Sequence, residues 1–276
     1  MTRKFKGQPL SLLLRILVDL AAVITAGVLL SVVGYILIKG IPNLKLSMFA
    51  WEYTTENVSM TPAIINTLTM TAVSLLIAVP FGIGSAIYLA EYAHRGNKLV
   101  RIIRLTTETL SGIPSIVYGL FGYLMFVMAL KWSYSLLAGT LTLAIMILPL
   151  IMRTTEEALK AVPDMYREGS YGLGAGRLRT VFCIVLPPAV PGILSGIILG
   201  IGRIVGETAA LIYTAGTITG VADGLFSSGR TLSVHMYALL SEGLYTEQAY
   251  ATAVILLVVV IIINAISAWI ARKVMR

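Results

Sequence analysis

Two opposite charges lie inside a long apolar stretch of the sequence. Arg203 lies near the middle of the segment Ile193–Tyr213, and Glu207 follows four residues later, on the same face of a predicted helix. Each charge costs roughly 2.5–3.5 kcal/mol at the centre of a membrane helix, so both are expected to face a bundle interior or a wet cavity. A guanidinium presents a planar set of donors that matches the oxygens of an oxyanion such as phosphate. One interpretation is therefore an anion path, in which Glu207 competes for the arginine and keeps binding weak.

A simpler interpretation is that the two charges only neutralise each other during insertion. It explains the pairing but not the presence of either charge, since two leucines would insert at lower cost. Catalysis is a poor alternative, because no paired carboxylates, Ser/His pair or metal cluster falls at the expected membrane depth. The single cysteine, Cys183, and the distant histidines His94 and His235 predict no metal site. The residues that carry chemistry therefore favour transport over reaction.

The composition favours a membrane protein. Of 276 residues, 57% are hydrophobic and 12% are charged, whereas soluble domains carry roughly 25% charged residues. Six segments are long enough, or nearly so, to cross a bilayer. They are Ile16–Ile38, Ile64–Leu89, Ile113–Leu130, Ser135–Met152, Ile193–Tyr213 and Ala251–Ile270. The sequence thus predicts an all-α polytopic fold with six transmembrane helices, and the first stretch is too long for a signal peptide.

Most basic residues fall in alternate segments between these helices. They are Arg3, Lys4, Lys6, Arg15, Arg95, Lys98, Arg101, Arg104, Arg153, Lys160, Arg167, Arg177, Arg179, Arg272, Lys273 and Arg276. By the positive-inside rule, both termini are expected to be cytoplasmic. Residues 1–15 then form a cytoplasmic tail, and residues 16–276 form a single transmembrane domain. The net charge of +8 is interpreted as orientation and contact with the lipid bilayer, and no nucleic acid is expected as a partner.

The longest predicted cytoplasmic loop spans residues 153–190. Arg153 begins a helical continuation of the fourth transmembrane helix, and Pro163-Asp164 marks a break with a new helix start. Glycines at 169, 172 and 174 follow, and the loop ends at Pro187-Pro188. We expect a short helix, a glycine turn, a second amphipathic piece and a proline stop.

This loop resembles the coupling loop in permease subunits of binding-protein-dependent ABC importers. That pattern is Glu-Ala-Ala, three residues, Gly, nine residues, Ile-x-Leu-Pro, and here Gly169 and Ser170 replace the two alanines. In the family the loop forms a helix that docks in a groove of the ATPase subunit. The resemblance assigns the coupling role to Tyr166, Arg167, Glu168, Gly169, Ser170, Gly174, Ala175, Ile184, Leu186 and Pro187.

Nucleotide chemistry has no motif in this chain. The Walker A pattern Gly-x4-Gly-Lys-Ser/Thr does not occur in the sequence. We therefore expect the chain to bind no cofactor and to have no ATPase site of its own. ATP and magnesium would be used by a partner ATPase.

Four further motifs resemble the A-type permeases of phosphate importers, the PstA family. They are Gly206–Ala209, Arg153–Glu156, Tyr88–Tyr92 and Pro114–Val117. The resemblance implies a type I ABC importer permease fold of the MetI-like kind in the cytoplasmic (inner) membrane of a bacterium or archaeon. It also implies a second, C-type permease, a homodimeric ATPase and an extracytoplasmic phosphate-binding protein. Thr208 joins the predicted substrate path, and Arg153 is a second candidate for anion contact or only a flanking positive charge.

Two alternatives stay open. The same scaffold serves other oxyanions, such as molybdate or sulfate, and only the resemblance favours phosphate. An ATPase-independent channel or carrier is disfavoured by the complete spacing of the coupling loop. The outer segment Thr214–Tyr250 either contacts a binding protein or is a solvated loop.

Overall fold

The computed structural model describes residues 9–94 and 96–274, and within them every regular element is helical. In chain order the α-helices are α1 (Pro9–Gly40), α2 (Thr61–Ile87), α3 (Lys98–Ser111), α4 (Ser115–Gly122), α5 (Leu136–Lys160), α6 (Asp164–Gly172), α7 (Arg177–Thr180), α8 (Leu186–Val205), α9 (Ala209–Thr214), α10 (Leu232–Glu242) and α11 (Thr246–Val274). Three π-helical turns extend them, at Tyr88–Tyr92, Tyr123–Ala129 and Val181–Val185. The predicted basic residues Arg3, Lys4, Lys6, Arg95 and Arg276 lie outside the described residues.

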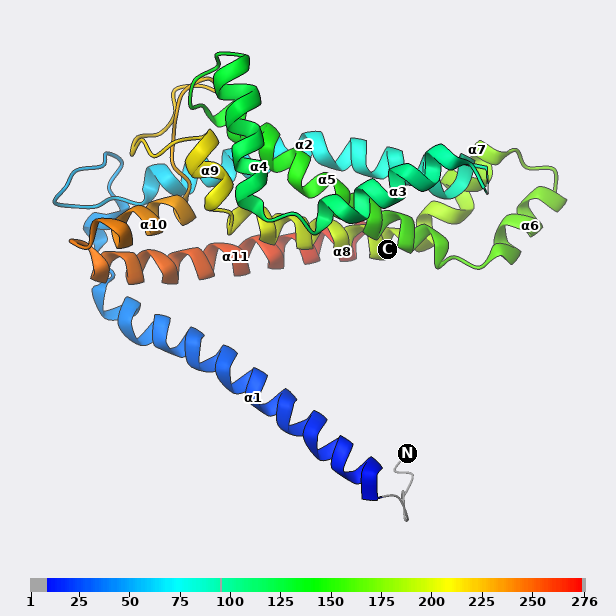
Figure 1. Cartoon of the computed structure of the whole chain (residues 1–276), viewed down its shortest axis with the longest axis horizontal. Helices are drawn as coiled ribbons and strands as arrows, with labels where there is room; N and C mark the ends of the chain where they lie inside the picture. The colour runs from blue at the N-terminus through cyan, green and yellow to red at the C-terminus, as the bar shows by residue number, and fades with distance from the viewer. Residues whose placement is uncertain (1–8, 95, 275–276) are drawn as a thin grey trace.

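Helix α5 is the centre of the bundle. It packs against α2, α8, α3, α4 and α9, and Leu143, Ile147 and Ile151 on it are fully buried. Helices α2, α5, α8 and α11 run along the long axis of the molecule (Figure 1). We refer to the end that carries α6 and α7 as the α6 end, and to the opposite end, which carries α9 and α10, as the α10 end.

Helix α1 stands apart from this bundle (Figure 1). Its most apolar 18-residue window buries none of its residues against the rest of the described chain. Contact is made at its C-terminal end, where Gly40 lies directly against the backbone of Tyr250 on α11. Any side chain at residue 40 would overlap the Tyr250 carbonyl, so glycine permits this single attachment.

The prediction of an all-helical membrane protein is confirmed. Within the described residues, five helices are long and apolar enough to cross a bilayer. The third predicted segment, Ile113–Leu130, differs: its helix runs only from Ser115 to Ala129 and is bent by 105° from α3. Fifteen residues span roughly 22 Å, less than the roughly 30 Å of a bilayer core. The helices Lys98–Ser111 and Ser115–Ala129 meet the length and composition of a sixth span only when they are taken together across the bend at Gly112–Pro114.

The fifth predicted segment also differs from Ile193–Tyr213. Helical structure begins at Arg177 and continues to Val205, so Pro187 does not stop a helix. Pro187 and Pro188 occupy the first turn of α8, where a backbone N–H has no required partner, and a π-helical turn precedes them. At the other end, the helix breaks at residues 206–208 before α9 begins.

Candidate functional site

The predicted coupling segment forms a short helix at the α6 end of the molecule (Figure 1). Pro163 is its N-cap and Asp164 places a carboxylate in its first turn, which favours the start of a helix. The outer surface of α6 carries Tyr166 and Glu168, both exposed, and Leu173 directly after the helix is 91% exposed. With Met165 and Tyr171, which are also exposed, Tyr166 and Leu173 give this end several exposed large apolar side chains, which is typical of a surface that binds a partner.

Arg167 attaches α6 to the rest of the bundle. Its Nη2 lies 2.7 Å from Glu91 Oε1, and its Nε lies 3.2 Å from Glu91 Oε2. The same guanidinium donates to the carbonyl oxygens of Val162 and Leu159, at 2.7 and 2.8 Å. These bonds raise the pKa of Arg167 above its ordinary value, chiefly through Glu91. One side chain therefore joins α6 to the C-terminal end of α5 and to the turn after α2.

Glu91 is the anchor of α6, and the sequence alone predicted no role for it. It lies in the π-helical turn Tyr88–Tyr92 after α2, and only 9% of it is exposed. Its position in a motif shared with phosphate permeases was visible, and so was a lone carboxylate at the end of an apolar segment. The sequence did not show its partner, because Arg167 is 76 residues away in the chain.

Glycine at position 169 of α6 is not required by packing against the residues that the structure describes. A Cβ atom built on Gly169 would meet nothing within 4 Å. Glycine inside a helix destabilises it by roughly 1 kcal/mol relative to alanine. Gly174 has φ of +83°, a left-handed conformation that favours glycine and turns the chain after the helix. Ala175 continues this turn by donating its N–H to Ser170 O at 3.1 Å.

Most of the remaining predicted coupling residues lie after α6, up to the first turn of α8. The hydroxyls of Ser170 and Thr180 lie 2.8 Å apart and join α6 to α7. Leu186 packs on a buried cluster with Leu159 and Val162 at the end of α5. Ile184 and Pro187 are exposed on the outer side of this segment. The predicted residues are therefore brought together, some as an exposed surface and others as its support.

The predicted pairing of Arg203 with Glu207 on one helix face is wrong. Helix α8 ends at Val205, with Gly206 as its C-cap, so Glu207 lies beyond the helix. Its carboxylate instead accepts from the backbone N–H of Ala210 at 3.0 Å and caps the start of α9. Ser233 on α10, 26 residues further along the chain, donates to the Glu207 carbonyl oxygen at 2.5 Å. This hydrogen bond stabilises the break between α8 and α9.

Arg203 is left half-buried on the last turn of α8. Among the described residues it has no ion pair and no hydrogen bond, and its charge acts on the phenol of Tyr118 on α4. Thr208 is half-buried in the break, with its hydroxyl 3.5 Å from Gly206 O. The arrangement offers a free guanidinium next to exposed backbone, which suits transient contact with an anion.

Arg153 lies in a different place from Arg203. It is on the last third of α5, its side chain is 54% exposed, and its Nε lies 2.9 Å from Glu157 Oε1. It lines a cavity of about 230 Å³ together with Arg104, Glu108 and Lys160. The structure therefore does not bring Arg153 and Arg203 into one cluster.

Close helix contact fixes the position of the break. Gly119 on α4 lies against α9, where an added Cβ would come within 2.7 Å of Ala210 Cα. Gly122 lies in the same way against Thr142 and Thr214. Such contacts between small residues let helix backbones approach closely in a membrane protein.

The outer segment 214–250 is ordered by polar residues of α2. Asn66 donates to the carbonyl oxygens of Gly220 and Arg230, at 3.0 and 3.2 Å, and accepts from Ala222 N–H. Thr67 accepts from the backbone N–H of Leu232 at the start of α10. The segment is therefore not simply a solvated loop, since α10 packs onto the bundle through buried hydrogen bonds.

The fold is that of a polytopic helical membrane protein. The fold is similar to the methionine ABC transporter MetNI in inward-facing conformations, with a TM-score of 0.60, 22% identity and coverage of 79% of this chain and 94% of the other. It is also similar to a bacterial alginate ABC transporter in complex with an alginate pentasaccharide-bound periplasmic protein, with a TM-score of 0.64, 17% identity and coverage of 94% and 97%.

The chain belongs to the family of binding-protein-dependent transport system inner membrane components, which matches residues 78–276. It is therefore a transporter component and not itself an enzyme. A probable ABC transporter permease protein, YqgI of Bacillus subtilis (strain 168), is 32% identical over 93% of this chain and 93% of its own length.

Phosphate permeases are also among the relatives. The phosphate transport system permease protein PstA of Pasteurella multocida (strain Pm70) is 43% identical over 64% of this chain and 63% of its own length. PstA 1 of Mycobacterium tuberculosis (strain ATCC 25618 / H37Rv) is 36% identical over 75% and 68%. The resemblance predicted from short motifs therefore extends over most of the chain.

Proposed function

We propose that this chain is the A-type permease subunit of an ATP-driven importer of inorganic phosphate. The assignment of phosphate as the substrate rests on the 43% identity to a phosphate permease across 64% of the chain. The chain would form half of the translocation path, and a related C-type permease would form the other half. A phosphate permease of that type, PstC of Mesorhizobium japonicum, is itself 31% identical over 83% of this chain.

Arg203 is the proposed anion contact on the path. A half-buried arginine without an ion pair among the described residues keeps its donors available, and guanidinium donors match phosphate oxygens. Weak, transient contact is what transport requires, because a tightly held anion would not be released. Thr208 and the backbone at the break are proposed to add neutral donors next to it. Arg153 is proposed only as a flanking charge, since it is exposed and paired with Glu157.

Helix α6 is the proposed docking surface for a homodimeric ATPase. Exposed Tyr166, Glu168 and the open face of Gly169 support close seating in a protein groove. This chain would bind no cofactor, while ATP and magnesium belong to the ATPase. An extracytoplasmic phosphate-binding protein would deliver the anion at the α10 end. The proposal places the α6 end and both termini on the cytoplasmic side of a bacterial or archaeal inner membrane, as the basic residues favour.

Anion-dependent ATP turnover by the reconstituted complex tests this function. Phosphate-loaded binding protein is expected to stimulate turnover, whereas sulfate and molybdate are not. The Arg203→Ala variant should lose most phosphate uptake while its complex still assembles, and Arg203→Lys should retain part of it because the charge remains. Arg15→Ala on α1 is the matched control, since Arg15 is exposed. Stimulation by sulfate or molybdate instead of phosphate would identify the alternative oxyanion and remove the proposed substrate.

A further inference from the structure

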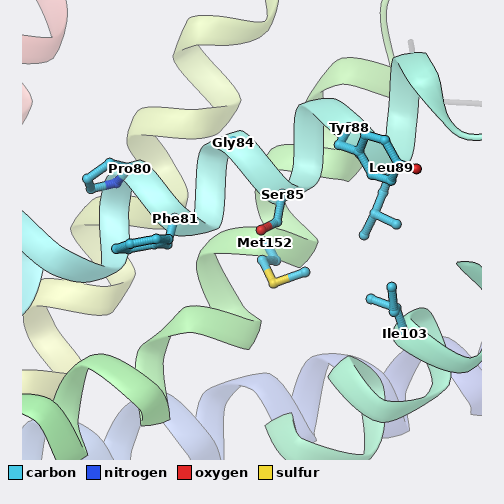
Figure 2. Close-up of a pocket in the computed structure, with 8 residues that line it drawn as sticks. All are labelled: Pro80, Phe81, Gly84, Ser85, Tyr88, Leu89, Ile103 and Met152. Carbon is cyan, nitrogen blue, oxygen red and sulfur yellow. The ribbon is translucent and has the colours of Figure 1, made fainter.

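Two adjoining cavities near the α6 end differ in chemistry. One, of about 440 Å³, lies between α2, α3 and α5 and is lined mainly by apolar side chains such as Phe81, Leu89 and Met152 (Figure 2). The other, of about 780 Å³, is lined by the π-helical turn after α2, by α3 and by α6. Leu89 lines both, so the apolar cavity meets the polar one at this residue.

The polar cavity carries an excess of positive charge. Arg101 and Arg177 line it without an ion pair among residues 9–94 and 96–274, and the Arg177 guanidinium lies over the ring of Tyr92 at 5.4 Å. Arg104 also lines it, with Nη2 held by Glu156 at 2.7 Å and by Leu89 O at 3.1 Å. The guanidinium of Arg104 is thus fixed at the junction of the two cavities. Several arginines around one space form a typical site for a phosphate group.

The apolar cavity is open to a surface that suits hydrocarbon. A Cβ atom built on Gly84, which lines this cavity, would meet nothing within 4 Å, so the wall of α2 is free there. On α3, Leu99, Ile102 and Leu105 are each more than 60% exposed and repeat every three residues. Such a helix, apolar on one face and carrying arginines on another, is typical of a position at the membrane interface.

We infer that the two cavities together bind one anionic phospholipid. The headgroup phosphate lies among Arg101, Arg104 and Arg177, and one acyl chain follows the apolar cavity past Phe81 and Gly84. Free inorganic phosphate carries the same headgroup chemistry, but it leaves the adjoining apolar cavity without an occupant. A partner protein helix could fill the apolar cavity, but it would also need a carboxylate placed at the arginines. An anionic lipid matches both halves, and basic cavities beside membrane helices are known sites for such headgroups.

Lipid binding to the purified full-length chain tests this inference. Native mass spectrometry after delipidation would compare phosphatidylglycerol with phosphatidylcholine of the same acyl chains. We expect preferential retention of phosphatidylglycerol. The double variant Arg101→Ala/Arg177→Ala should weaken it by about tenfold or more, since each basic residue near a lipid surface contributes measurably. Arg15→Ala/Arg179→Ala is the matched control, because both residues are exposed and lie outside the cavity lining.

A second pair of variants tests the acyl chain separately. Gly84→Leu adds an apolar side chain to the cavity wall at a position where an added Cβ meets nothing within 4 Å, and it should also reduce phosphatidylglycerol retention, because it takes up space for hydrocarbon. Gly27→Leu on α1 is its control, since a side chain there also meets nothing within 4 Å. Unchanged retention in Gly84→Leu, or equal retention of the two lipids, would overturn the site. Displacement of the lipid by millimolar inorganic phosphate would identify a free-anion site instead. Loss of the lipid on assembly with the other subunits would show that a protein covers this face.

Discussion

Charges are neutralised differently at the two ends of this molecule. At the α6 end, Arg167 is paired with buried Glu91, and Glu156 Oε1 forms ion pairs with Arg104 and Lys160, each at 2.7 Å. At the α10 end, Arg230 is only 4% exposed and its guanidinium lies over the ring of Tyr53 at 4.8 Å. The charges at the α6 end are balanced by ion pairs with partly or fully buried carboxylates, whereas burial at the α10 end acts against the charged form.

His235 is the clearest example of a buried titratable side chain at the α10 end. This side chain is fully buried, its ring meets the edge of Tyr53, and burial together with the charge of Arg230 lowers its pKa to about 3. Burial also lowers the pKa of Arg230 below its ordinary value. The helices of the α6 end are therefore held by ion pairs, whereas the side chains of the α10 end are held by burial away from water.

The largest effect is expected from breaking the ionic attachment. Arg167→Met leaves Glu91 buried without its partner, which costs about 3–5 kcal/mol for a buried pair. Thermal unfolding followed by tryptophan fluorescence should show a strongly lowered midpoint, and phosphate uptake should fall with it. The exposed pair of Arg15 and Asp19 supplies the control, since Arg15→Met should cost less than about 1 kcal/mol. Similar losses in both variants would contradict the special role of Arg167.

A large pH effect is expected at the opposite end. His235 is neutral when folded and has an ordinary pKa of 6.5 when unfolded, so its contribution to stability is fully present above pH 6.5. It is lost as the pH falls from 6.5 towards 3, because the unfolded chain then binds a proton that the folded chain does not. Between pH 8 and pH 4 the loss should reach about 3 kcal/mol.

The difference between variants isolates this contribution from that of the carboxylates. His235→Leu should flatten the dependence of the unfolding midpoint on pH between 7 and 4. His94→Leu should leave it unchanged, because His94 is exposed. A flat profile in the unmodified protein would show that water reaches His235 and would remove the contrast between the ends.

A smaller effect is expected at the break between α8 and α9. Glu207→Ala removes the acceptor for the buried N–H of Ala210 and should cost about 2 kcal/mol. Glu207→Gln keeps an oxygen acceptor and should retain both stability and most transport. Strong loss of uptake in Glu207→Gln with a normal unfolding midpoint would return Glu207 to the anion path as a charged partner.

The smallest effect is expected at Ser170. Ser170→Ala removes the hydroxyl contact with Thr180 between α6 and α7 and should cost about 1 kcal/mol. Because Arg167 remains, ATPase binding measured by co-purification should persist. Complete loss of binding would mean that the ionic attachment alone does not hold α6 in place.

The membrane helices were predicted well from sequence because a long apolar run fits a membrane span and little else. Prediction failed where a contact from elsewhere overrides the local pattern. Gly206-Glu207-Thr208 fits a helix by its spacing, but Ser233, 26 residues away, bonds to the backbone at Glu207 and stabilises the break. The prediction of a proline stop at Pro187 was wrong for a local reason. Pro187 lies in the first turn of α8, where a proline does not end a helix.

The candidate coupling helix was found from sequence because its residues are adjacent in the chain. Its anchor was not found, because Glu91 lies in a separate turn and only the fold brings it to Arg167. The same holds for Asn66, whose three hydrogen bonds reach residues more than 150 positions away. Spacing within one element is visible in a single sequence, whereas pairing between elements is not.

Helix α5 is hydrogen-bonded to other elements at both of its ends. At one end, the N–H of its N-cap Ser135 donates to Thr214 O, where α9 ends. At the other end, Leu159 O accepts from the Arg167 guanidinium beneath α6. Twenty-five residues make a rod about 38 Å long. Helix α5 therefore links the anchor of α6 at one end of the bundle directly to the end of α9 at the other.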